Sequence, residues 1–149
     1  MAEKRIFFAC GAPKSGTTWL QRVLDAHPQV QCSGEGHFIE RFTIPLAGVL
    51  RDYAAHMNQV AGRVYEGQPY YPSIEQEDLD RIARGFILDR LMRRKPGTGV
   101  RWMGDKTPRY TGHLPQLLRL FPRALHQHRS RPARCRDGPD ASGPACWSF

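Results

Sequence analysis

The residues with the clearest chemical potential lie in a glycine-framed loop near the N-terminus. Residues Gly11–Thr18 read G-A-P-K-S-G-T-T, after the apolar run Ile6–Cys10 and before an amphipathic segment that starts at Trp19. The order strand, loop, helix predicts an oxyanion site. The first backbone N–H groups of a helix have no partners within the helix, and its dipole is positive at that end.

The position of the lysine separates this loop from a Walker A motif. In G-x-x-x-x-G-K-[ST] the lysine follows the second glycine, whereas here Thr17 follows Gly16 and the lysine is Lys14, inside the loop. A lysine there suits one terminal oxyanion better than a triphosphate. The sequence shows no apolar strand ending in a clear Walker B acid, since Asp105 lies within Gly-Asp-Lys-Thr. The sequence therefore offers no clear acidic partner for the magnesium ion of a Walker-type site.

Two motifs together resemble the sulfotransferase family that uses 3′-phosphoadenosine 5′-phosphosulfate (PAPS) as sulfuryl donor. Pro13–Leu20, P-K-S-G-T-T-W-L, resembles the loop that binds the 5′-phosphosulfate. Gly104–Tyr110, G-D-K-T-P-R-Y, resembles the G-[ED]-K-[ST]-P-x-Y element of bacterial and Golgi carbohydrate-type members. The loop Ser33–Phe38 is a looser match, because these enzymes carry an acidic residue there after a His-Pro helix end. The resemblance covers roughly residues 6 to 125 and implies PAPS as co-substrate, with no metal.

The resemblance implies sulfuryl transfer to a hydroxyl or amine. Acceptor and leaving oxygens lie in line in such a transfer, so positioning and charge stabilisation supply most of the catalysis. Lys14 would neutralise charge on the departing oxygen. Glu35, flanked by glycines, is the first candidate for the general base, and His37 is the second. Lys106 would contact an anionic acceptor or the transferred sulfonate.

The expected donor-binding residues are Pro13, Lys14, Ser15, Gly16, Thr17, Thr18 and Trp19. The backbone N–H groups of residues 15–18 and the two threonine hydroxyls would hold the 5′-phosphate. Structural interpretations stay open for the other candidates. Glu35 also fits a solvated loop acid or a helix cap, His37 a structural residue, and Lys106 the ion-pair partner of an acid.

Alternating strand and helix signals predict an α/β fold, with a three-layer, P-loop-like parallel sheet flanked by helices. Strands are expected at residues 4–10, 29–32 and 100–103, and helices at 17–26, 41–64, 114–120 and from a capping box at 73–76 to residue 95. The helix that follows this capping box is expected to place its apolar residues on one stripe, made of Leu79, Ile82, Ala83, Phe86 and Leu91. Residues 1–125 form the expected domain, which we interpret as an N-terminal fragment truncated at its C-terminus.

Charge, cysteine spacing and the lack of an evident targeting segment limit which classes of function fit the chain. The 149 residues carry a net charge of +8, which suits anionic ligands. No C-x-x-C pair, signal peptide or transmembrane run is apparent, so a cytoplasmic protein without a membrane span is expected. The expected acceptor is a small molecule, carbohydrate or lipid, with peptide hydroxyls and the oligomeric state left open. No specific nucleic-acid partner is expected. The alternatives are a P-loop kinase or NTPase with a degenerate Walker loop, and a non-enzymatic basic protein that binds nucleic acid.

The segment after residue 125 departs from the rest of the chain. Residues 126–143 contain no Ile, Val, Leu, Phe or Met, so a disordered tail is expected over residues 126–149. The resemblance implies a strand there, followed by a V-R-D-P-R-D-like motif for the 3′-phosphate. Reading Leu125–Arg134 from the second base of each codon permits F-I-N-I-V-R-D-P-R-D. We therefore hypothesise a frame-shifted tail and a weakened PAPS site.

Sequencing the coding DNA tests the frame-shift hypothesis. The third bases of the codons for Leu125–Arg134 are expected to spell the strand and the motif in the shifted frame. Third bases that encode other residues in that frame would exclude it.

Overall fold

The computed structural model describes residues 5–93 and 99–122, so the tail at 126–149 and the end of the domain at 123–125 lie outside the described residues. The elements, in chain order, are β1 (Arg5–Ala9), α1 (Thr17–Ala26), β2 (Val30–Ser33), a π-helical turn (Ile39–Thr43), α2 (Ile44–Val64), α3 (Gln76–Arg93), β3 (Trp102–Lys106), a 3-10 helix (Pro108–His113) and α4 (Leu114–Leu120). Among the described helices, none is long and apolar enough to cross a membrane.

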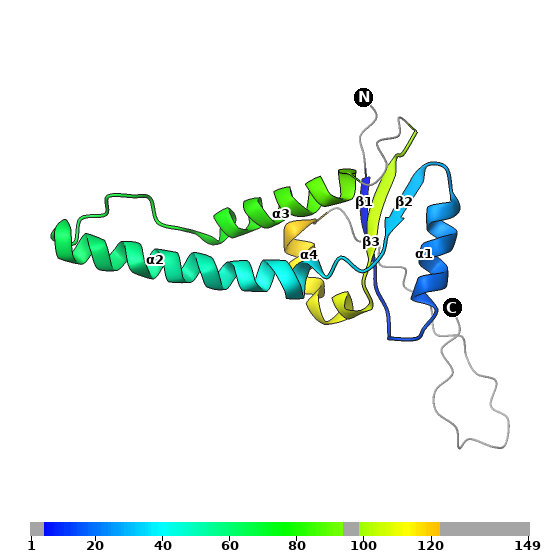
Figure 1. The fold of residues 1–149 in the computed structure, drawn as a ribbon, viewed down its shortest axis with the longest axis horizontal. Coiled ribbons are helices and arrows are strands. Elements are labelled where there is room, and N and C mark those ends of the chain that lie inside the picture. Colours follow the sequence, from blue (N-terminus) through cyan, green and yellow to red (C-terminus); the bar gives the residue numbers. More distant parts are fainter. Residues whose placement is uncertain (1–4, 94–98, 123–149) are drawn as a thin grey trace, which may run out of the picture.

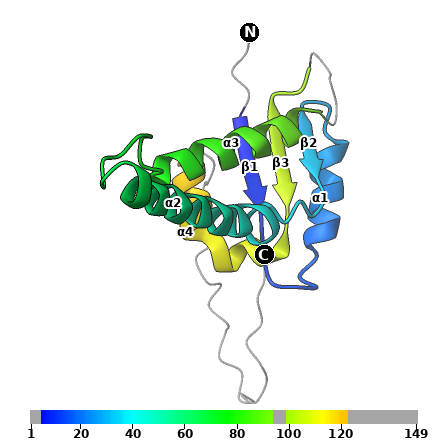
Figure 2. The same cartoon turned by 60° about the vertical axis from the view of Figure 1, so that its left-hand side comes forward.

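The three strands form one parallel sheet in the order β1-β3-β2. Helix α1 covers one face, and α3 and α4 lie on the other (Figure 1), while a second view shows the three arrows side by side (Figure 2). Helix α2 extends away from the sheet, and after a connecting loop the chain runs back toward the sheet as α3 (Figure 1). The predicted α/β class, with a parallel sheet flanked by helices, is confirmed.

The register of the sheet brings the predicted motifs together. Ala9 pairs with Lys106 on one side of β3, and Ser33 pairs with Asp105 on the other. The N–H of Thr107 donates to the carbonyl of Ala9 over 3.1 Å. Since the strands are parallel, the loops after β1, β2 and β3 leave the sheet at the same edge, where ligands bind in open α/β folds.

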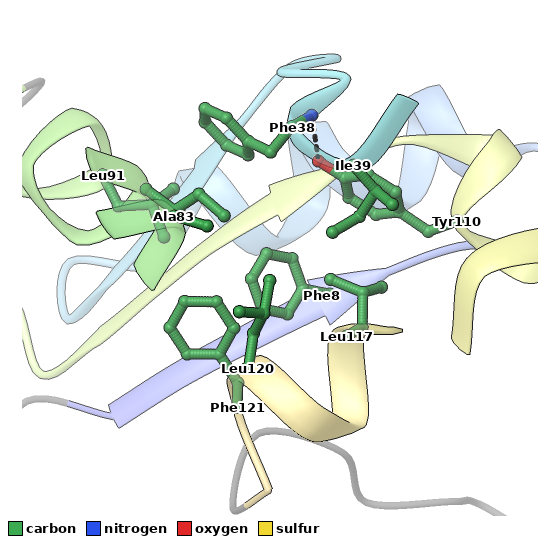
Figure 3. Packing of buried hydrophobic residues seen from close by; sticks show 10 residues of the cluster. Phe8, Phe38, Ile39, Ala83, Leu91, Tyr110, Leu117, Leu120 and Phe121 are labelled. Carbon is green, nitrogen blue, oxygen red and sulfur yellow. Dashed lines mark hydrogen bonds between the residues drawn. The ribbon is translucent and has the colours of Figure 1, made fainter. Parts of the chain in front are cut away.

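Aromatic and aliphatic side chains fill the space between the sheet and the helices α3 and α4 (Figure 3). Phe8 lies at the centre, with its ring 5.7 Å from Tyr110 in an edge-on contact and 5.1 Å from Phe121. The buried cluster consists of Phe8, Phe38, Ile39, Ala83, Ile87, Leu91, Tyr110, Leu117, Leu120 and Phe121. Phe38 and Tyr110 belong to predicted site loops, so the core anchors these loops directly.

The predicted third strand is misplaced by two to three residues. We expected residues 100–103 to form a strand that opened into a Gly-Asp-Lys-Thr loop, but β3 spans Trp102–Lys106. The backbone of Gly104 and Asp105 pairs with neighbours on both sides. The polar residues Asp105 and Lys106 are only 0% and 2% exposed. A search for apolar runs does not detect the burial of polar residues.

Helix α3 differs from the prediction at its start and along its buried face. Ser73 does not complete the expected capping box, because its hydroxyl donates to the Glu75 carboxylate, while Asp78 accepts from the Glu75 N–H. Ile82 and Phe86, expected on the buried stripe, are 39% and 40% exposed. The buried face follows a four-residue spacing, at Leu79, Ala83, Ile87 and Leu91, because α3 meets the sheet along a narrow line. Residues 94–95 lie outside the described part of the helix.

Gly104→Ala is expected to destabilise the protein by about 1–3 kcal/mol. A Cβ at Gly104 would lie 2.5 Å from the ring of Phe7 and 2.5 Å from its backbone oxygen, and the backbone of a paired strand cannot move aside alone. Urea denaturation measures the loss. Gly85→Ala is the control, because a Cβ there meets nothing within 4 Å in helix α3, and alanine favours a helix by about 1 kcal/mol over glycine. Equal effects of the two substitutions would contradict the proposed crowding.

Candidate functional site

The loop Gly11–Thr18 makes a tight turn between β1 and α1. Lys14 has a φ of 64° and Gly16 a φ of 81°, so both adopt the left-handed region. The N–H of Ser15 donates to the carbonyl of Ala12 over 3.1 Å. The non-glycine Lys14 therefore holds a conformation that costs free energy, which is a feature enriched at functional sites.

Helix α1 starts from this turn with its first N–H groups directed at the loop. The helix begins at Thr17 after Gly16, which caps it without a side-chain hydrogen bond. Leu20 donates to the Gly16 carbonyl over 3.0 Å, and this bond leaves the preceding N–H groups of the first turn for a ligand. Thr17 is buried, whereas Lys14 and Thr18 are exposed. This arrangement fits an anionic group with a cation beside it.

Trp19 stands out among the predicted donor-binding residues, because 69% of its surface is exposed. Leu20 and Val23 on the same helix are 40% and 48% exposed. These apolar side chains of α1 therefore face largely toward solvent in the part of the chain that the structure describes. They lie next to the loop.

Lys106 connects two of the predicted motifs. Its ammonium Nζ lies 2.8 Å from Oε1 of Glu35 and 3.4 Å from the hydroxyl of Thr18. The Lys106 side chain is 3% exposed, whereas that of Glu35 is 47% exposed. A buried cation thus stands between the start of α1 and a carboxylate that reaches solvent. The structure places Thr18, Glu35 and Lys106 together, and it shows that Lys106 pairs with Glu35 rather than with its neighbour Asp105.

His37 lies between two carboxylates. Its Nδ1 is 2.6 Å from Oε1 of Glu40, and its Nε2 is 3.3 Å from Oε2 of Glu35. A neutral imidazole has one N–H, so only the imidazolium form donates to both carboxylates. Sequence reasoning missed Glu40. Its spacing of three residues from His37 is the signal that would have indicated it.

The ionisation of these carboxylates follows from their neighbours. The hydrogen bond and the charge of Lys106 hold the pKa of Glu35 below its ordinary value, with a smaller contribution from His37. Partial burial acts to raise the pKa of Glu40, but hydrogen bonds, first of all that from His37, outweigh burial and lower it. Both side chains are therefore carboxylates at neutral pH, and Glu35 can accept a proton.

Comparison with known proteins identifies the family of this chain. A model described as the sulfotransferase family matches residues 7–135. The chain belongs to the sulfotransferase family. The match includes the loop after β1, the Glu35 loop and the Gly104–Tyr110 motif, the three regions that predicted sulfuryl transfer.

Proteins with similar sequences include protein-tyrosine sulfotransferases. Protein-tyrosine sulfotransferase 1 of Mus musculus is 29% identical over 119 residues, and protein-tyrosine sulfotransferase 2 of Gallus gallus is 30% identical over 120 residues. Each alignment covers 80% of this chain and 29% of the relative, so the chain spans less than a third of the length of these relatives. Their names specify a protein acceptor, a class outside the small-molecule, carbohydrate or lipid acceptors expected from the sequence.

The contribution of the Glu35–Lys106 ion pair to stability is expected to depend on pH. Because Lys106 lowers the folded-state pKa of Glu35, the stabilisation is present above the ordinary carboxyl pKa of about 4.3 and is lost as the pH falls through the lower folded-state value. The difference in free energy of unfolding between wild type and Glu35→Gln should shrink from about pH 6 to about pH 3. Urea denaturation across this range measures it, and Glu77→Gln on α3 controls for the change of charge. A difference that stays constant would contradict the ion pair.

Proposed function

We propose that this sulfotransferase moves a sulfuryl group from PAPS to a hydroxyl or amine acceptor. The observation that carries the proposal is the position of Lys106. Its ammonium lies within 3.4 Å of Thr18 at the donor loop and 2.8 Å from Glu35. A cation between an oxyanion loop and a carboxylate can stabilise the negative charge of a group in transfer between them.

The donor would be held by the loop after β1. The N–H groups of the first turn of α1 and the hydroxyl of Thr18 would bind the 5′-phosphate, and Lys14 would neutralise charge on the bridging oxygen as it departs. The N–H of Ser15 is already donated to Ala12, so the groups that follow it supply the binding. PAPS supplies an activated sulfuryl group whose leaving group is the phosphate.

The acceptor would be activated by Glu35. A hydroxyl that attacks the sulfur forms a new O–S bond and gives its proton to the Glu35 carboxylate, while the S–O bond to the phosphate breaks. Glu35 suits this role better than His37, because both ring nitrogens of His37 already face carboxylates. When Lys106 turns from Glu35 to the sulfonate, the carboxylate loses its main charged partner and becomes a stronger base.

The names of the relatives indicate which acceptor class to test first. Their names specify protein tyrosine, and a phenolic hydroxyl meets the requirement for a proton-bearing nucleophile. A peptide tyrosine is therefore the first acceptor to test on this chain, with carbohydrate, lipid and small-molecule hydroxyls beside it.

Lys14→Ala is expected to weaken binding of 3′-phosphoadenosine 5′-phosphate about 10- to 100-fold, because a hydrogen bond to a charged group contributes about 1.5–3 kcal/mol. Calorimetric titration measures the affinity. Arg63→Ala removes the same charge near the end of α2, far from the loop (Figure 1), and should bind as the wild type does. The titration is also run on a chain with the reading frame restored after Leu125, where tighter binding is expected.

Two outcomes would contradict the proposal. Equal affinities of Lys14→Ala and wild type would exclude the loop as the donor site. Magnesium-dependent binding of ATP, without any response to 3′-phosphoadenosine 5′-phosphate in either chain, would favour the kinase or NTPase alternative.

A further inference from the structure

We propose that Asp105 is a positioning residue for Glu35, acting by fixing the backbone of the loop that carries it. The proposal rests on the proposed function, in which Glu35 is the general base. Asp105 lies opposite Ser33 in the sheet, at the point where β2 ends and this loop begins. Its side chain is out of reach of solvent, with an exposure of 0%.

The carboxylate of Asp105 receives hydrogen bonds from three groups. Oδ2 accepts from the hydroxyls of Thr107 and Tyr110 over 2.8 Å and 2.9 Å. The N–H of Gly36 lies 3.1 Å from Oδ1 and 3.2 Å from Oδ2. Burial raises the pKa of Asp105 above its ordinary value, and these hydrogen bonds offset part of that rise. Each of the three donors therefore stabilises the ionised form of the buried Asp105 carboxylate.

The side chains of Asp105, Thr107 and Tyr110 accept hydrogen bonds from three successive backbone N–H groups of the loop. Gly36 donates to Asp105, and His37 donates to the Thr107 hydroxyl over 3.4 Å. Phe38 donates to the Tyr110 hydroxyl over 3.2 Å, as Figure 3 shows. The hydroxyls of Thr107 and Tyr110 in turn donate hydrogen bonds to the Asp105 carboxylate. The carboxylate thus orients both hydroxyls as acceptors, and the three contacts form one network.

This network has a direct consequence for Glu35. Gly36 follows Glu35 in the chain, and His37, with a φ of 48°, needs support for its left-handed conformation. Side chains of successive strand residues point to opposite sides, so Asp105 reaches the loop backbone while Lys106 reaches the Glu35 carboxylate. Without the backbone contact, Glu35 is free to leave Lys106.

Asp105→Asn tests the proposal through the titration of Glu35. An amide cannot accept from both sides, so either the Gly36 N–H or the two hydroxyls lose an acceptor. In the folded variant, the Glu35 pKa measured by carboxyl carbon NMR should rise by about 1 as the carboxylate loses its charged partner. Asp105→Glu, which keeps a carboxylate, should lie closer to wild type. Asp89→Asn on α3 removes the same charge from an exposed ion pair and should leave the Glu35 pKa unchanged.

A wild-type Glu35 pKa in folded Asp105→Asn would overturn the proposal. If that variant does not fold, Tyr110→Phe keeps the ring in the core and removes the hydroxyl, and the same titration decides. Hydrogen exchange in wild-type protein needs no variant: the Gly36, His37 and Phe38 amides should be protected, and exchange at the rate of an open loop would overturn the proposal. None of these measurements requires donor binding, so they can fail or succeed independently of the Lys14 titration.

Discussion

The site depends on the pairing of one strand, β3, with a parallel neighbour on each side. This pairing sets Lys106 beside Ala9 and Asp105 beside Ser33, so the ends of all three strands meet at one edge. A shift of β3 by one residue would exchange the directions of Asp105 and Lys106. The buried lysine would then point away from Glu35. Close packing of Gly104 against Phe7 holds the strand in this register.

Charge is concentrated where the sheet ends. Asp105 and Lys106 are both buried there, and burial of an unpaired charge is costly in free energy. Each has a partner in the loop after β2: Asp105 accepts a hydrogen bond from the backbone N–H of Gly36, and Lys106 pairs with the side chain of Glu35. The free-energy cost of burying these two charges in β3 is therefore offset by contacts that also order the loop after β2. The same contacts stabilise the fold and set the geometry of the site.

The sequence predicted the parts of the fold that follow local rules. Helix α1 and helix α4 have the expected bounds, because a loop glycine and flanking prolines or aromatics mark their ends. The position of β3 was wrong, since its last residues are polar and owe their burial to partners distant in sequence. Thr18 and Glu35 were predicted as site residues from their motifs. Their convergence on Lys106 and the contact of Glu40 with His37 depend on tertiary packing, which no local pattern contains.

The central claim is that the loop after β1 binds the phosphosulfate end of PAPS with Lys14 as its cation. A crystal structure with 3′-phosphoadenosine 5′-phosphate at saturating concentration tests it most directly. The account predicts the 5′-phosphate at the first-turn N–H groups of α1, in contact with Lys14 and on the Thr18 side of Lys106. A nucleotide bound at another face of the sheet, or with its 5′-phosphate away from Lys14, would contradict it.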